Sequence, residues 1–283
     1  MGKGLEVVTS FVTAPGAVLT AAAAAVGNSL AIRAADVRSK VWLVNAWSFN
    51  QVIGVTRIRS PRLHDAVNGM RWRQPAAQVT PHYPADPLSA FPQFLIPQDT
   101  LIIEQSGSGV GGQIESNTML VYYENLPGVA ARLIDQPTLN KNGINLTTVE
   151  TSITAVATGQ YGGGVVLNAA ANSQNLKANT DYAVIGGLVD TRGTVVRISG
   201  VDFGSLGVGY PAEPSLQDYT ANFFGRMSVG YGIALIPVLN SANAGGITVD
   251  VQTNQAGGTF IVTLNLVELQ PNVVPLATSG PTV

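Results

Sequence analysis

The sequence predicts an all-β protein built as two similar halves, each a β-sandwich or β-barrel with a short helix in a loop. Three observations lead to this prediction. The 283 residues include 31 glycines and 16 prolines, which disfavours long helices and favours short strands joined by turns. Charged residues make up only 11% of the chain, against about a quarter in a typical soluble domain. Runs of β-forming residues also recur in the same order in both halves.

The small number of charged residues allows a prediction about the surface of the molecule. Hydrophobic residues make up 46% of the sequence, and the net charge is only −2. Because charged side chains keep soluble monomers apart, such a surface is poorly suited to a solitary protein. We therefore expect other subunits to cover much of the exterior.

The chain begins with a predicted strand, LEVVTSFVT at residues 5–13, and continues into a segment of small residues. Residues 7–32 carry no charge and are long enough to cross a bilayer. The run is nevertheless rich in alanine rather than leucine, and it contains Pro15 and Gly16. We therefore expect a strand followed by an N-terminal arm that lies against a neighbouring subunit.

A spacing of 140 residues relates the two halves. The tripeptide LIP occurs at 95–97 and again at 235–237, and the dipeptide RI occurs at 57–58 and again at 197–198. Identity across the whole offset is low, so the order of features matters more than individual matches.

That order is the same in both halves. Each has a pair of β-rich runs, then a short helical pattern, then the LIP tripeptide, and finally a closing hairpin. The runs lie at 40–60 and 180–200, the helical patterns at 60–70 and 213–225, and the hairpins at 100–126 and 246–269. We expect an N-terminal arm and first unit over residues 1–130, a linker over 131–143, and a second unit with a C-terminal tail over 144–283.

Residues for catalysis or metal binding are scarce. There is no cysteine, which excludes disulfides and thiol chemistry, and the two histidines, His64 and His82, are 18 positions apart. Residues 107–112 fit the glycine pattern of a dinucleotide site, but the following run alternates like a strand, so we expect a hairpin loop. We predict no enzyme activity, no metal and no cofactor.

Basic residues are concentrated near the N-terminus. Residues 1–73 carry nine basic and three acidic side chains, and eight of the basic ones fall between 33 and 73. One interpretation is a face directed at phosphate groups; the other is an ordinary surface whose arginines pair with acids from elsewhere. Trp and Arg are enriched in protein contacts, so we predict subunit-interface residues at Arg62, Arg71, Trp72 and Arg73.

With this duplicated strand order, a helix in each half, an N-terminal arm and few charges, the chain resembles the double jelly-roll major capsid proteins of tailless icosahedral viruses. The resemblance is architectural and covers most of the chain. It implies an all-β fold of two tandem jelly-roll β-barrels or sandwiches with short loop helices.

The resemblance also implies a function. Such proteins form trimers whose six jelly rolls make a pseudo-hexagonal tile of a virion shell assembled in the host cytoplasm. The implied partners are two further copies, neighbouring capsomers, and vertex or minor capsid proteins, with the basic N-terminal region facing an internal membrane or the genome. The alternative function is a tandem carbohydrate-binding or adhesin-like β-sandwich.

Overall fold

The fold is described by a computed structural model. It describes residues 2–25, 27–33, 38–49, 54–60, 67–73, 91–107, 114–154, 157–191, 193–214, 217–253 and 258–275. All structural statements below concern these residues.

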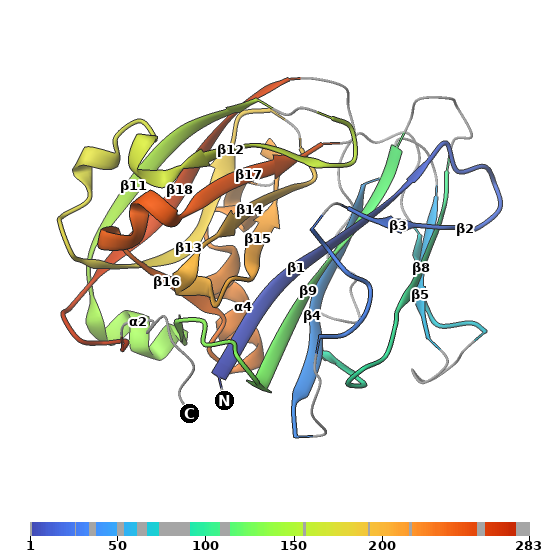
Figure 1. Ribbon diagram of the computed structural model, residues 1–283, viewed down its shortest axis with the longest axis horizontal. Coiled ribbons are helices and arrows are strands. Elements are labelled where there is room, and N and C mark those ends of the chain that lie inside the picture. Colours follow the sequence, from blue (N-terminus) through green and yellow to red (C-terminus); the bar gives the residue numbers. More distant parts are fainter. Residues whose placement is uncertain are drawn as a thin grey trace.

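The first unit consists of two antiparallel sheets, seen at the right of Figure 1. One sheet has the order β3 (Ala23–Ala24), β1 (Gly2–Thr13), β9 (Ile114–Leu126), β4 (Lys40–Phe49) and β7 (Gln93–Leu95). The other has the order β2 (Thr20–Ala21), β8 (Ile102–Ser106), β5 (Val55–Arg59) and β6 (Met70–Arg73).

The second unit repeats this arrangement. One sheet has the order β10 (Leu133–Ile134), β16 (Ile236–Asn240), β13 (Asp181–Val189), β18 (Thr259–Leu269) and β11 (Gly143–Thr154). The other has the order β12 (Tyr161–Val166), β17 (Thr248–Gln252), β14 (Val195–Ser199) and β15 (Gly207–Pro211).

Both units have the strand order of a jelly roll. Without β3 and β10, each unit has eight strands in chain order. One sheet contains these strands in the order first, eighth, third, sixth. The other sheet contains them in the order second, seventh, fourth, fifth. Two four-stranded antiparallel sheets connected in this way define the fold. The predicted all-β fold class is confirmed.

Irregularities of the sheets recur at equivalent places. The register of β1 shifts between Gly2 and Gly4, and that of β11 shifts between Gly143 and Asn145. The register of β4 shifts after Leu43, and that of β13 shifts after Val184. Both pairs are 141 positions apart. Because a bulge re-aims every following side chain, matched bulges mean that equivalent residues point to equivalent faces.

Helices are short and belong mainly to the second unit as described. They are α2 (Gln136–Asn142), α3 (Gln217–Thr220) and α4 (Phe223–Tyr231), with 3₁₀ turns at Leu167–Ala169, Ser173–Asn175, Val201–Phe203 and Ser241–Gly246. α2 begins at the cap Asp135, whose carboxylate accepts the Thr138 amide. The segment predicted as a linker, 131–143, therefore contains β10 and α2, and β10 pairs with β16. Of the helix predicted over 60–70, residues 61–66 lie outside the described part of the chain.

The N-terminal arm prediction needs correction. After β1, the chain folds back onto its own unit: β3 pairs with β1, β2 pairs with β8, and Ala31 bridges to Thr100. The small side chains of this segment permit that close approach. No helix within the described residues is long and apolar enough to cross a membrane.

Two apolar clusters form the core. One fills the first unit and reaches Leu206 of the second, and the other joins both units. The second cluster takes from the first unit Leu5, Val7, Val44, Trp47, Leu120 and Tyr122. In Figure 1, β1, β9 and β4 accordingly lie between β5 and β8 on one side and the second unit on the other. β1 is therefore buried on both faces from Gly4 to Ser10, including its polar residues Glu6, Thr9 and Ser10.

Candidate functional site: the contact between the units

The two units meet sheet to sheet. The outer face of β1, β9 and β4 packs against the outer face of the sheet that contains β12, β17, β14 and β15. Val7 lies close to β15: a Cβ atom added at Gly209 would be 3.2 Å from the Cγ1 atom of Val7. Further along β1, the Thr9 and Tyr161 hydroxyls are hydrogen-bonded at 2.7 Å. The glycine at 209 thus permits the close approach of the two sheets.

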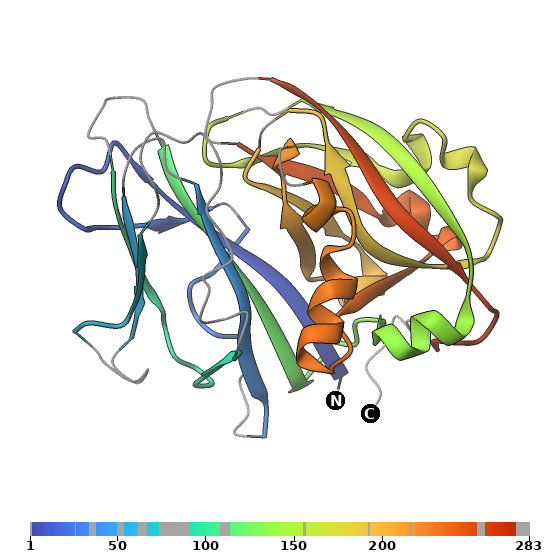
Figure 2. The same cartoon turned by 180° about the vertical axis from the view of Figure 1, so that it is seen from behind.

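Helix α4 extends this contact (Figure 2). The Trp47 indole is 1% exposed and donates to the Thr194 carbonyl at 2.9 Å. Its ring meets Phe223 edge to face at 5.9 Å between centroids. The Tyr231 hydroxyl donates to the Val44 carbonyl at 2.6 Å. Hydrogen bonds to buried backbone carbonyls fix the relative position of the units more specifically than apolar packing alone.

An ion pair and an aromatic ring occupy the middle of the contact. The Arg197 guanidinium pairs with Asp250 at 3.0 Å and lies 3.6 Å above the centroid of the Tyr161 ring. Burial raises the pKa of Tyr161 to about 12, although the Arg197 charge and the hydrogen bond with Thr9 oppose the rise. The phenol therefore stays neutral at physiological pH and serves as a hydrogen-bonding and stacking group.

The first unit carries the equivalent ion pair on the equivalent face. Arg57 and Glu104 are register partners on β5 and β8, just as Arg197 and Asp250 are on β14 and β17. Glu104 also receives Arg59 at 3.0 Å. Hydrogen bonds from Arg59 and then Arg57 lower the pKa of Glu104 to about 2. The RI match found at a spacing of 140 thus marks the same structural position in both units.

Ion pairs within the chain account for part of the positive charge of the basic N-terminal region. Arg57 and Arg59 share Glu104, and Arg33 donates to Glu6 at 2.8 Å. Three of the eight clustered basic residues therefore face acids within the chain. This supports the interpretation of a surface whose arginines pair with acids over that of a phosphate-binding face.

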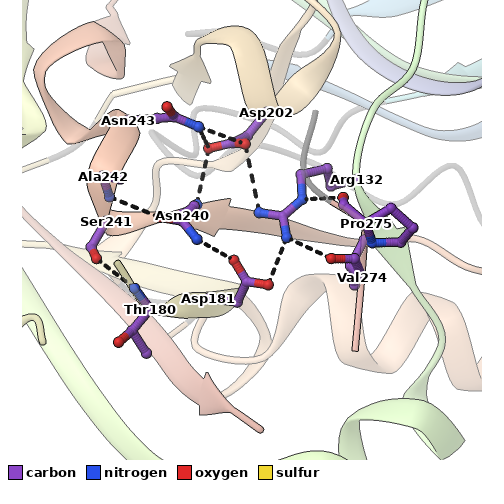
Figure 3. Close-up of polar contacts among 10 residues, drawn as sticks. All are labelled: Arg132, Thr180, Asp181, Asp202, Asn240, Ser241, Ala242, Asn243, Val274 and Pro275. Atoms are coloured by element: carbon purple, nitrogen blue, oxygen red, sulfur yellow. Dashed lines mark hydrogen bonds and ion pairs between the residues drawn. The ribbon is translucent and has the colours of Figure 1, made fainter. Parts of the chain in front are cut away.

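A buried polar cluster joins the connection between the units to the second unit (Figure 3). The side chain of Arg132 is 2% exposed and pairs with Asp181 at 2.6 Å and with Asp202 at 3.6 Å. It also donates to the carbonyls of Val274 and Pro275, at 3.0 and 2.9 Å. One guanidinium thus fixes the chain between the units, two segments of the second unit and the segment that follows β18.

Asn240 completes this cluster. Its amide group donates to Asp181 at 2.7 Å, and its backbone N–H donates to Asp202 at 2.9 Å. Asn243 also donates to Asp202, at 3.0 Å. Each buried carboxylate therefore has several donors, as buried charges require. We did not identify these residues from sequence; the available signal was isolated charges in apolar surroundings.

Three of the four predicted interface residues, Arg71, Trp72 and Arg73, lie on β6. Arg71 is exposed, and its Nε donates to the Asn68 carbonyl at 3.2 Å. The backbones of Trp72 and Arg73 pair with Thr56 and Val55 on β5. The side chains of those two residues, and all of Arg62, lie outside what the structure describes. The structure therefore brings three of the four onto one edge strand and leaves their interface role a prediction.

The candidate residues for metal and dinucleotide binding lie mostly outside the described part of the chain. No group of three His, Asp or Glu side chains among them could hold a metal ion. His64 and His82 both lie outside these residues, as do residues 108–112 of the glycine-rich segment. The next described element after that segment is strand β9, whereas a dinucleotide site requires a helix there.

Comparison with known proteins gives little further information. No protein-family model matches the sequence, and no curated protein matches it. Among solved structures, the PBSX exported protein XepA has a TM-score of 0.26 and 9% identity, over 93% of this chain and 86% of the other. The major capsid protein P2 of bacteriophage PM2 has a TM-score of 0.20 and 6% identity, over 95% and 98%. Scores this low carry no functional argument, so the proposals below depend on topology and contacts.

Proposed function

We propose that this protein is a structural coat protein whose copies assemble as trimers into an icosahedral virus shell, without catalytic activity. The single observation that carries the proposal is the duplication itself. Each chain contains two jelly rolls with the same strand order and matched bulges. Three such chains present six similar units around an axis, the arrangement that fills a roughly six-fold lattice.

Rigidity of the unit supports this role. The shared apolar cluster and the Trp47 and Tyr231 hydrogen bonds hold the two jelly rolls in one orientation. A shell requires such fixed geometry, because each subunit must repeat the same contacts many times.

The surface supports assembly as well. Among the described residues, nine large apolar side chains are exposed: Val18, Val67, Phe91, Phe94, Ile144, Leu146, Val201, Val229 and Ile261. Together with the low charge of the chain, they favour contacts with other subunits. Neighbouring capsomers and vertex or minor capsid proteins are the partners we propose, in a virion assembled in the host cytoplasm.

Contact of the N-terminal region with a membrane or genome is part of the same proposal, with one restriction. Arg33, Arg57 and Arg59 already face Glu6 or Glu104. Such a contact would therefore use other basic residues.

The test is the mass and shape of the purified protein. Light scattering after gel filtration and negative-stain microscopy should show particles or pseudo-hexagonal trimers. A protein that stays monomeric at high concentration and binds a sugar on a glycan array would instead be a carbohydrate-binding module.

A further inference from the structure

The sequence contains two Asn-Gly dipeptides, Asn68-Gly69 and Asn142-Gly143. Asparagine is one of the chemically labile side chains of proteins, and a following glycine increases its reactivity. The backbone nitrogen of the glycine attacks the side-chain carbonyl of the asparagine, and no glycine side chain obstructs the approach. The two dipeptides share this intrinsic chemistry, so the structure around each of them decides whether it reacts in the folded protein.

The structure protects Asn142-Gly143. Asn142 is the last residue of α2, and its side-chain amide donates to the Thr138 carbonyl at 2.8 Å. The N–H of Gly143 donates to the Leu139 carbonyl as the cap of the same helix. Both reacting groups therefore take part in the hydrogen bonds that end α2, and those bonds must break before the ring can close.

Asn68-Gly69 lies in a different environment. Asn68 is exposed and lies in the turn that leads into β6. Gly69 has a φ of 58°, and a Cβ atom added there would lie 2.3 Å from the Ile58 carbonyl oxygen, so the position requires glycine. Among the described residues, the Gly69 N–H donates no hydrogen bond. The attacking nitrogen is therefore not tied to a backbone carbonyl as it is at Gly143.

An arginine also contacts the peptide bond that would react. The Nε atom of Arg71 donates to the Asn68 carbonyl at 3.2 Å, and this carbonyl belongs to the peptide that links Asn68 to Gly69. When the Gly69 nitrogen loses its proton, negative charge spreads onto that carbonyl oxygen. A positive charge beside the oxygen favours the charged form. Arg71 thus makes the Gly69 nitrogen a better nucleophile.

We propose that Asn68 is a site of spontaneous deamidation in the folded protein, whereas Asn142 is protected. The deprotonated Gly69 nitrogen forms a bond to the Cγ atom of Asn68, and the side-chain amide leaves as ammonia, which gives a cyclic succinimide. Water then hydrolyses one of the two ring carbonyls. Hydrolysis at Cγ gives an aspartate, and hydrolysis at the backbone carbonyl gives an isoaspartate.

The modification would change the charge next to β6. It places a carboxylate close to Arg71 and to Arg57, whose Nη1 atom donates to the neighbouring Val67 carbonyl at 3.1 Å. Two guanidinium groups therefore flank the new negative charge. The isoaspartate product would also lengthen the backbone of the turn by one atom. This inference does not depend on the proposed shell function.

Peptide mapping by mass spectrometry tests the proposal. The native protein and the same protein unfolded in urea are incubated at mildly alkaline pH, and the conversion of the two asparagines is followed over time. The ratio of the Asn68 rate to the Asn142 rate should be at least about tenfold higher in the native protein than in urea, a difference of about 1.4 kcal/mol in activation free energy. An equal ratio in the two states would overturn the proposal, and so would an Asn68 that stays intact in the native protein.

Variants of Arg71 test its contribution. Arg71→Ala, checked for wild-type circular dichroism, should slow the native conversion of Asn68 several-fold, and Arg71→Lys should restore part of the rate because it keeps the positive charge. Arg226→Ala is the control, since Arg226 also donates to a backbone carbonyl, that of Asp218, at 2.7 Å. It should leave the Asn68 rate unchanged. An unchanged rate in Arg71→Ala would overturn the role given to Arg71.

Discussion

Arg132 fixes the connection between the units through one buried charge. Its guanidinium faces Asp181 and Asp202, and its other donors reach two carbonyls beyond β18. Removing one member of a buried ionic cluster leaves uncompensated charge, which is more costly than the net contribution of the intact cluster.

Arg132→Ala should lower the free energy of unfolding by about 3–5 kcal/mol, because Asp181 and Asp202 would remain buried without their cation. Urea unfolding followed by circular dichroism measures the change. Lys177→Ala is the control: Lys177 also pairs with an acid, Glu268, but its side chain is 61% exposed. That variant should lose no more than about 1 kcal/mol. Equal losses in the two variants would contradict the role given to Arg132.

The pH dependence of stability should contain a contribution from Glu104. Its folded pKa of about 2 lies below the ordinary value of 4.5, so the stabilisation is present above pH 4.5 and is lost as the pH falls toward 2. Burial raises the pKa of Glu6, so protonation of that residue acts in the opposite direction. Comparing wild type with Glu104→Gln separates the two effects.

The stability difference between wild type and Glu104→Gln should be largest at neutral pH and should shrink between pH 4.5 and 2. Unfolding curves at several pH values measure it. A difference that stays constant across this range would mean that the arginines do not hold the carboxylate in its charged form.

The contacts made by single side chains were the feature least predictable from the sequence. The RI dipeptides were noticed because they recur, and the structure gives both arginines an acidic register partner. Arg132 and Asp202 belong to no repeated sequence feature, and only folding brings them together. Buried polar clusters depend on long-range contacts, which local patterns do not encode.

At the scale of elements, strands followed local pattern and loops did not. The run at 5–13 lies within β1, and the two predicted closing hairpins supply the strands β8 and β9 and the strands β17 and β18. The hairpins themselves were predicted wrongly, because the two strands of each pair lie in different sheets and do not pair with each other. The helical pattern at 213–225 is observed as α3 and α4, and α4 continues to Tyr231, where Gly232 ends it in a left-handed conformation. The N-terminal arm was mispredicted because small residues fit an edge strand as well as an external arm.

Leu146→Asp should weaken assembly and leave the monomer folded, because Leu146 is one of the exposed apolar side chains proposed to contact other subunits. Analytical ultracentrifugation should show at least a tenfold weaker association, the effect of about 1.4 kcal/mol. Val229→Asp, on α4 and similarly exposed, should assemble as wild type. Unchanged assembly of Leu146→Asp would show that the exposed side of β11 takes no part in subunit contacts.

At the scale of the whole molecule, the two units share one core and should unfold together. The apolar cluster that joins them contains Trp47, which also hydrogen-bonds across the junction. The duplicated order of features predicted two units from sequence. It did not predict how the units pack, because that contact depends on which sheet faces are apolar after bulges have re-aimed the side chains.

Trp47→Ala should lower the free energy of unfolding by about 3–5 kcal/mol, because it removes a large buried side chain at the junction. Trp42→Ala, at a partly exposed position, should cost less. Calorimetry should still show one transition for wild type. Two separate transitions, with only one shifted by Trp47→Ala, would show that the units are independent.

The account depends on one physical idea: a chain with two similar jelly rolls is built to assemble as three copies around an axis. The native mass of the purified protein over a range of concentrations tests it most directly. We predict a species of three times the 29.4 kDa chain, alone or within larger particles. A single 29.4 kDa species at every concentration would contradict it.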